Sequence, residues 1–124
     1  DFILAKMDAR LIIQVIINIV DNAIKYTPPH SQITLTTSRQ ADKVIVEIAD
    51  NGEGISDEAK KRVFDMFYTD STKIVDGRRS LGLGLALCKS IITAHGGEIA
   101  VLDNQPHGTV FRFSLPAEEV TLHE

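Results

Sequence analysis

Two asparagines and a lysine share one face of an otherwise apolar segment, INIVDNAIKYTP, at residues 17–28. On an α-helix, residues four and seven apart lie within roughly 40° of each other, so Asn18, Asn22 and Lys25 point the same way. Tyr26 lies at the edge of that face. An amide oxygen is a hard ligand suited to Mg²⁺, a lysine is a point charge suited to phosphate, and a tyrosine ring offers a flat surface for a base. The alternative is that the asparagines bond to neighbouring backbone and the lysine is solvated.

A second group, DNGEGI, combines one carboxylate with two glycines directly after a predicted strand. Gly52 and Gly54 permit a positive φ or the close approach of a ligand, and Asp50 would point into the space that they leave. The group is not an EF-hand loop, because Gly52 stands where Asp or Asn is needed and Ile55 stands where Gly is needed. A tight turn capped by the Asp50 side chain is the alternative.

The third group opens a predicted helix with the sequence SLGLGL, which comprises Ser80, Leu81, Gly82, Leu83, Gly84 and Leu85. Helix N-termini bind anions because their free N–H groups and the helix dipole both point at the ligand. The pattern is not a Rossmann fingerprint, since Leu87 stands where the third glycine belongs, and the chain has no Walker A lysine motif. The alternative here is close packing of the helix.

The elements that position these groups follow from hydrophobic periodicity. We expect a helix over 8–26 with Asp8 as N-cap and Pro28-Pro29 as its stop; strands over 32–37 and 43–49 joined by the link RQAD; a helix over 57–67 capped by Ser56; a long loop over 69–81; a helix over 83–95 closed by Gly96-Gly97; strands over 98–102 and 109–115; and a tail over 117–124. This order predicts a two-layer α+β (α/β) sandwich, with three helices on one face of a mixed, mostly antiparallel sheet. Loops as long as 69–81 are usually functional.

Composition narrows the class of protein. The 124 residues suit a single domain over 1–116 followed by the tail 117–124, and the net charge of −4 argues against nucleic acid as a partner. There is no apolar run near the roughly 18 residues of a membrane span and no signal-peptide pattern, which predicts a cytoplasmic location. Cys88, the single cysteine, is expected in the core, where it cannot form an internal disulfide.

The groups follow one another in the order and spacing of a known family. NIVDNAIKYT resembles the N box of sensor histidine kinases, DNGEGI their G1 box, FDMF their F box, and SLGLGLALCKSIITAHGG their G2 box with its helix. HGTVFRFSLP resembles the closing region, so the resemblance covers about residues 5–116. The stretch YTDSTKIVDGRRSLGLGLALCKSI is similar to the potassium-responsive Kdp-type sensor kinases.

This resemblance implies an ATP-binding domain of the Bergerat (GHKL) fold, which gyrase, Hsp90 and MutL share, with ATP and Mg²⁺ as cofactors. Asn22 would coordinate Mg²⁺ with Asn18 assisting, and Lys25 would meet phosphate. These three would be the catalytic residues. Tyr26 would cover the adenine, and Asp50 would accept from its 6-amino group.

The remaining assignments by resemblance surround the nucleotide. Gly52 and Gly54 would make room for the base, Ile55 would line its pocket and Thr109 would lie near it. Phe64 and Phe67 would anchor the entry of an ATP lid over 69–81, and phosphate would be met by Lys73, Arg78, Arg79 and the backbone of Gly82 and Gly84. Leu81, Leu83 and Leu85 belong to the same nucleotide-binding box.

The reaction type follows from what this sequence lacks. The ATPase relatives carry Glu where this chain has Asn18, and Asn takes no proton at neutral pH, which favours phosphoryl transfer over hydrolysis. None of His30, His95, His107 and His123 has the surroundings of a phosphoacceptor, and His95 is expected to be structural.

The resemblance therefore implies transfer to a histidine on a separate dimerisation domain and from there to a response regulator. The isolated domain would be monomeric, on the cytoplasmic side of a membrane-anchored parent. A GHKL ATPase module and a non-catalytic nucleotide-sensing domain are the alternatives.

Overall fold

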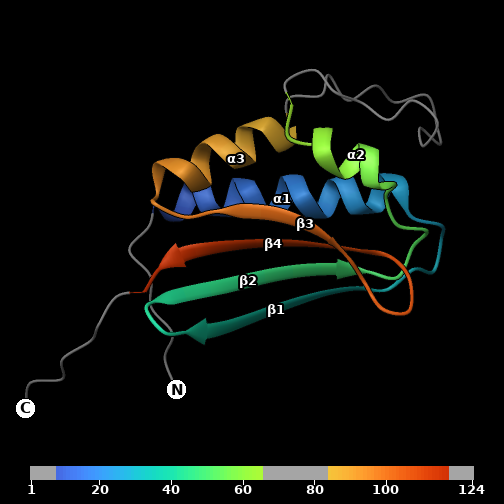
Figure 1. Cartoon of the computed structure of the whole chain (residues 1–124), viewed down its shortest axis with the longest axis horizontal. Coiled ribbons are helices and arrows are strands. Elements are labelled where there is room, and N and C mark those ends of the chain that lie inside the picture. Colours follow the sequence, from blue (N-terminus) through green and yellow to red (C-terminus); the bar gives the residue numbers. More distant parts are fainter. Residues whose placement is uncertain (1–7, 66–83, 118–124) are drawn as a thin grey trace, which may run out of the picture.

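Three helices lie on one face of a four-stranded antiparallel sheet in the computed structural model, which describes residues 8–65 and 84–117 (Figure 1). The elements in chain order are α1 (Ala9–Tyr26), β1 (Ile33–Gln40), β2 (Lys43–Asp50), α2 (Asp57–Arg62), α3 (Gly84–Ala94), β3 (Ile99–Asp103) and β4 (Thr109–Pro116). The strand order is β1-β2-β4-β3, and each neighbouring pair is antiparallel. The predicted two-layer sandwich is confirmed, and the described strands contain no parallel pair.

Both predicted helix caps are present. The Asp8 side chain accepts a hydrogen bond from Arg10 N at 3.1 Å, and Ser56 Oγ accepts one from Ala59 N at 3.1 Å. Each cap satisfies a backbone N–H that has no partner inside its own helix. The local sequence therefore determines where α1 and α2 begin.

Helix α2 is shorter than expected. It ends at Arg62, so the prediction of a helix through residue 65 and beyond is wrong within the described residues. The ring of Phe64 meets Phe111 edge to face, with ring centroids 6.2 Å apart. This contact packs the segment that follows α2 against the sheet. Lys60 further ties α2 to the sheet through an ion pair with Asp103 at 2.8 Å.

The hairpin between β1 and β2 is tighter than the link RQAD suggested. Arg39 and Gln40 continue β1, paired with Val44 and Lys43, and only Ala41 and Asp42 form the turn. The apolar alternation of β1 stops before its backbone pairing does, which explains why the strand was predicted too short.

The core lies between the helices and the sheet. Val15 and Ile19 of α1 and Ile92 of α3 are fully buried, against Phe111 and Phe113 of β4. Cys88 is buried as expected, and its burial raises the pKa of the thiol to about 11. In the ranges that the structure describes, no helix is long and apolar enough to span a membrane.

Candidate functional site

Asp50 ends β2 on the side of the sheet that faces the helices, with only 6% of its surface exposed. Its Oδ1 accepts hydrogen bonds from the backbone N–H of Gly52 at 2.9 Å and of Thr109 at 3.2 Å. No hydrogen bond reaches Oδ2 from the described residues, and none of their side-chain polar atoms is both sealed from solvent and without a partner. One carboxylate oxygen is thus fixed and the other is available to a ligand.

The turn after Asp50 has the backbone that its glycines permit. Gly54 has a φ of +85°, and a Cβ on Gly52 would lie 2.7 Å from Cγ2 of Thr27. The Oδ1 bond to Gly52 N is the self-capped turn that the sequence left open, but it uses only one oxygen of Asp50. Thr27 is the C-cap of α1, so the end of that helix lies against this turn.

Gly52 and Thr109, two of the residues predicted to surround a base, both bond to this carboxylate. Thr109 is buried beside Asp50 at the start of β4. Ile55 is half-buried and packs against the core. The sequence predictions for Asp50, Gly52, Gly54, Ile55 and Thr109 thus fall at one end of the sheet.

The two asparagines of α1 have different surroundings. Asn18 Oδ1 accepts from Gln14 Nε2 at 2.8 Å, and its Nδ2 donates to the carbonyl of Gly84 at 3.4 Å. Asn22 is half-buried, and its side chain has no hydrogen bond in the described part of the chain. Hydrogen bonds within the fold therefore give Asn18 a structural role, and Asn22 has no such bonds in the described residues.

The Asn18 bond also brings two of the predicted groups together. It joins the polar face of α1 to the first residue of α3, 66 residues later in the chain. Leu85 is half-buried and packs against the core. Outside the described structure lie the side chains of Lys25 and Tyr26 and the residues Phe67, Lys73, Arg78, Arg79, Leu81, Gly82 and Leu83.

Two residues that sequence reasoning missed hold the Asp50 turn from the β3–β4 loop. Asn104 Nδ2 donates to the carbonyl oxygen of Asp50 at 2.8 Å, and His107 Nδ1 lies 2.9 Å from the carbonyl oxygen of Gly52. No local pattern marks either residue, because each partner lies more than 50 residues away in the sequence.

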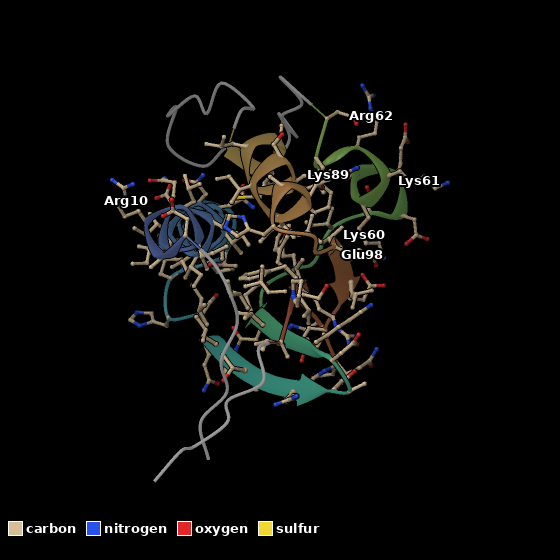
Figure 2. All side chains as sticks on the ribbon, turned by 90° about the vertical axis from the view of Figure 1, so that its left-hand side faces the viewer. Arg10, Lys60, Lys61, Arg62, Lys89 and Glu98 are labelled. Carbon is tan, nitrogen blue, oxygen red and sulfur yellow. The ribbon has the colours of Figure 1, made fainter. Side chains whose placement is uncertain are left out.

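A hollow of about 720 Å³ adjoins this turn but is distinct from the Asp50 carboxylate. Its lining comes from α2, from the turn after β2 and from the β3–β4 loop, and includes Ile55, Arg62 and Gly108. Neither Asp50 nor the asparagines of α1 line it. On α2, Lys60 lies beside β3, whereas Lys61 and Arg62 point away from the sheet (Figure 2).

His95 has the structural role expected of it. Its Nε2 accepts from the backbone N–H of Asp8 at 3.0 Å, and its Nδ1 lies 2.8 Å from the carbonyl oxygen of Ile91. Both ring nitrogens are used within the fold, which joins the end of α3 to the start of α1.

Known proteins match this chain along nearly its whole length. The family of histidine kinase-, DNA gyrase B- and HSP90-like ATPases matches residues 7–119. The sensor protein KdpD of Clostridium acetobutylicum is 46% identical over 118 residues, which are 95% of this chain and 13% of that relative. The chain therefore spans about an eighth of that relative's length.

Solved structures agree with the sequence relatives. A mycobacterial sensor histidine kinase, MprB, superposes with a TM-score of 0.83 at 27% identity, over 95% of this chain and 80% of that one. The histidine kinase ThkA, solved in complex with the response regulator TrrA, has a TM-score of 0.71 at 34% identity, over 90% of this chain and 30% of that one.

Proposed function

The chain belongs to the histidine kinase-, DNA gyrase B- and HSP90-like ATPase family as a catalytic domain of sensor histidine kinases, and we propose that it binds Mg²⁺-ATP and donates the γ-phosphoryl group to a histidine on a separate dimerisation domain. The observation that carries this proposal is the Asp50 carboxylate, with one oxygen fixed by two backbone N–H groups and the other without a hydrogen bond from residues 8–65 and 84–117.

The free oxygen of Asp50 is the group that would recognise the base. It would accept a hydrogen bond from the 6-amino group of adenine. Guanine presents a carbonyl at that position, so two acceptors would face each other in a buried site. A mismatch of this kind costs about 2–4 kcal/mol, and the site should prefer ATP to GTP accordingly.

The polar face of α1 would hold the metal and the phosphates. The amide oxygen of Asn22, which no described residue bonds, is a suitable ligand for Mg²⁺, which would neutralise phosphate charge when bound. Within the described ranges no cluster of three or more His, Cys, Asp or Glu side chains could hold a metal, so the ion would depend on Asn22 and on the nucleotide. Asn18 would assist through position, because its oxygen already accepts from Gln14.

The remaining nucleotide contacts stay proposals from the resemblance. Lys25, Lys73, Arg78 and Arg79 would supply positive charge, and backbone N–H groups around Gly82 and Gly84 would meet phosphate oxygens. Tyr26 would lie over the base. Positioning and charge neutralisation dominate phosphoryl transfer, so a site of amides, metal and cations suits this reaction.

The histidines of the chain support an acceptor elsewhere. His95 is fixed in the fold by both ring nitrogens, and one nitrogen of His107 faces the Gly52 carbonyl. The complex of ThkA with TrrA supports a response regulator as the later recipient. We further propose that the isolated domain is a monomer and that its parent anchors it on the cytoplasmic side of a membrane.

A trans-phosphorylation assay tests the reaction. The chain is mixed with γ-labelled ATP, Mg²⁺ and the helical dimerisation domain of its parent, and label on protein is compared with free phosphate. We expect label on the helical domain that is lost when the acceptor histidine becomes alanine. Phosphate release without labelled protein would instead identify an ATPase, and nucleotide binding without either product would identify a sensing domain.

A further inference from the structure

The β3–β4 loop holds the Asp50 turn through a fully oriented amide. Asn104 Nδ2 donates to the Asp50 carbonyl at 2.8 Å, while its Oδ1 accepts from Gln105 N at 2.9 Å. Its own backbone N–H donates to the carbonyl of Gly108 at 3.0 Å. A flipped amide would place a donor against a donor and an acceptor against an acceptor, so the orientation of Asn104 is determined by its partners.

The same loop reaches the turn at three further points. His107 Nδ1 lies 2.9 Å from the Gly52 carbonyl, which requires the ring hydrogen on Nδ1. Thr109 N, one residue past the loop, donates to Asp50 Oδ1. Gly108 has a φ of +113°, and a Cβ there would lie 2.0 Å from the Asp50 carbonyl oxygen. The loop backbone therefore lies directly against Asp50.

These contacts restrain both the backbone and the side chain of Asp50. The backbone carbonyl of Asp50 is held by Asn104 and its side-chain Oδ1 by Thr109, both from the same segment of the chain. Rotation of the Asp50 peptide would move Oδ2 away from the direction in which it would meet a base. Recognition of this kind needs placement within about 0.5 Å.

We propose that Asn104 is a positioning residue for purine recognition, which acts through Asp50 and sets the preference for a base with a 6-amino group. This inference rests on the proposed function, since it assumes that Asp50 meets the base. Asn104 itself touches no substrate. The competing explanation is that Asn104 only stabilises its own loop.

Two nucleotides and two substitutions separate these explanations. Binding of ATP is compared by calorimetry with binding of purine riboside triphosphate, which lacks the 6-amino group. Asn104→Asp keeps the acceptor for Gln105 N and removes the donor to Asp50, and Asn104→Ala removes the donor without adding charge. Gln40→Glu is the matched control, because Gln40 Oε1 accepts from Arg112 at 3.4 Å at the end of β1 away from Asp50, and the glutamate retains that acceptor.

We expect the unmodified chain to prefer ATP by roughly tenfold or more, as befits a hydrogen bond to a charged group. Both Asn104 variants should lose most of that preference through weaker ATP binding, with little change for purine riboside triphosphate. Gln40→Glu should keep it. In an Asp50→Asn background, a substitution at Asn104 should have less than about a twofold further effect on the preference, because residues that act through one another are not additive.

The outcomes are distinguishable. Equal losses for both nucleotides, or an unchanged preference in both Asn104 variants that bind ATP, would overturn the role of Asn104 and leave the proposed function standing. A lower urea midpoint with an equal loss for both nucleotides would identify a purely structural role. An unmodified chain that binds no ATP would overturn both proposals.

Discussion

The two ends of the candidate site differ in how much of their polar chemistry the protein already uses. At the Asp50 end, Thr109, Gly52 and Asn104 hold the carboxylate and its peptide, which leaves a single oxygen available. At the α1 end, the Asn22 side chain has no hydrogen bond in the described structure, and Asn18 is tied to Gly84. The first end is organised before any ligand arrives.

This difference indicates what each end would have to recognise. A base is rigid and presents fixed donors and acceptors, so a fixed carboxylate suits it. A metal with phosphates takes its geometry partly from the ligand, and a free amide can adapt to it. We therefore expect base selectivity to be sensitive to the loop around Asp50 and metal affinity to be sensitive to Asn22.

The largest expected effect comes from removing the Asp50 carboxylate, which the protein's own hydrogen bonds hold in place. Asp50→Ala removes the acceptor for the 6-amino group and leaves the N–H groups of Gly52 and Thr109 without their partner. ATP affinity should fall by about 100-fold, or about 3 kcal/mol, in calorimetric titration. Asp103→Ala is the matched control, because that exposed carboxylate pairs with Lys60. If Asp50→Ala bound ATP with unchanged affinity, this would show that the base does not bind at Asp50.

The next largest effect concerns the free energy of unfolding and comes from Cys88, in the core beneath α1. Burial raises the pKa of the Cys88 thiol to about 11, so the folded state holds this proton more tightly than the unfolded state does. The stabilising contribution is complete below pH 9 and is lost as pH rises to 11, by about 2 kcal/mol. Urea unfolding at pH 8.5 and 10.5 measures the loss, and Cys88→Ala should lack that part of it. If the free energy of unfolding changed equally with pH in both proteins, the pKa of the thiol would not be raised by burial.

A substitution of Asn22 tests whether the polar face of α1 serves a ligand rather than the fold. Asn22→Ala should weaken Mg²⁺-ATP binding by about tenfold, because it removes the proposed metal ligand. Binding in the presence of a chelator should hardly change. Alanine is the better helix former, so the free energy of unfolding should rise by about 0.5 kcal/mol. A variant that became less stable would show that Asn22 is a structural residue.

Asn18 gives the smallest effect and the opposite sign for stability. Asn18→Ala loses the bonds to Gln14 and Gly84, which should lower the free energy of unfolding by about 0.5–1 kcal/mol after the gain in helix propensity. Chemical denaturation measures both variants side by side. Equal stability changes for Asn18→Ala and Asn22→Ala would contradict the difference between the two amides.

Features with a local cause could be predicted from the sequence. The caps at Asp8 and Ser56 depend on bonds to residues two and three positions away, and both are present. The buried alternation of β4 follows from its own residues, and Cys88 lies in the core as its helical pattern indicated. The position of Asp50 followed from a strand that ends in a glycine turn.

Features with a distant cause could not be predicted. Phe64 packs against Phe111 just after α2 ends, and the restraint of Asp50 depends on Asn104, 54 residues away. The sequence indicated that Asn18 and Asn22 share a face but not that one is satisfied and the other is not. Part of that distinction arises from Gly84, which only the tertiary structure brings to α1, and the rest from Gln14 on the same helix.

The bond between Thr109 and Asp50 has a consequence for synthesis of the chain. Asp50 leaves the ribosome 59 residues ahead of Thr109, and β4 lies between β2 and β3 in the finished sheet. A nascent chain that stops short of β4 would contain the whole of DNGEGI, but its Asp50 carboxylate would lack the hydrogen bond from Thr109 N and would keep only the one from Gly52 N. Adenine affinity would then depend on the formation of β4, so nucleotide could stabilise only chains in which β4 has joined the sheet.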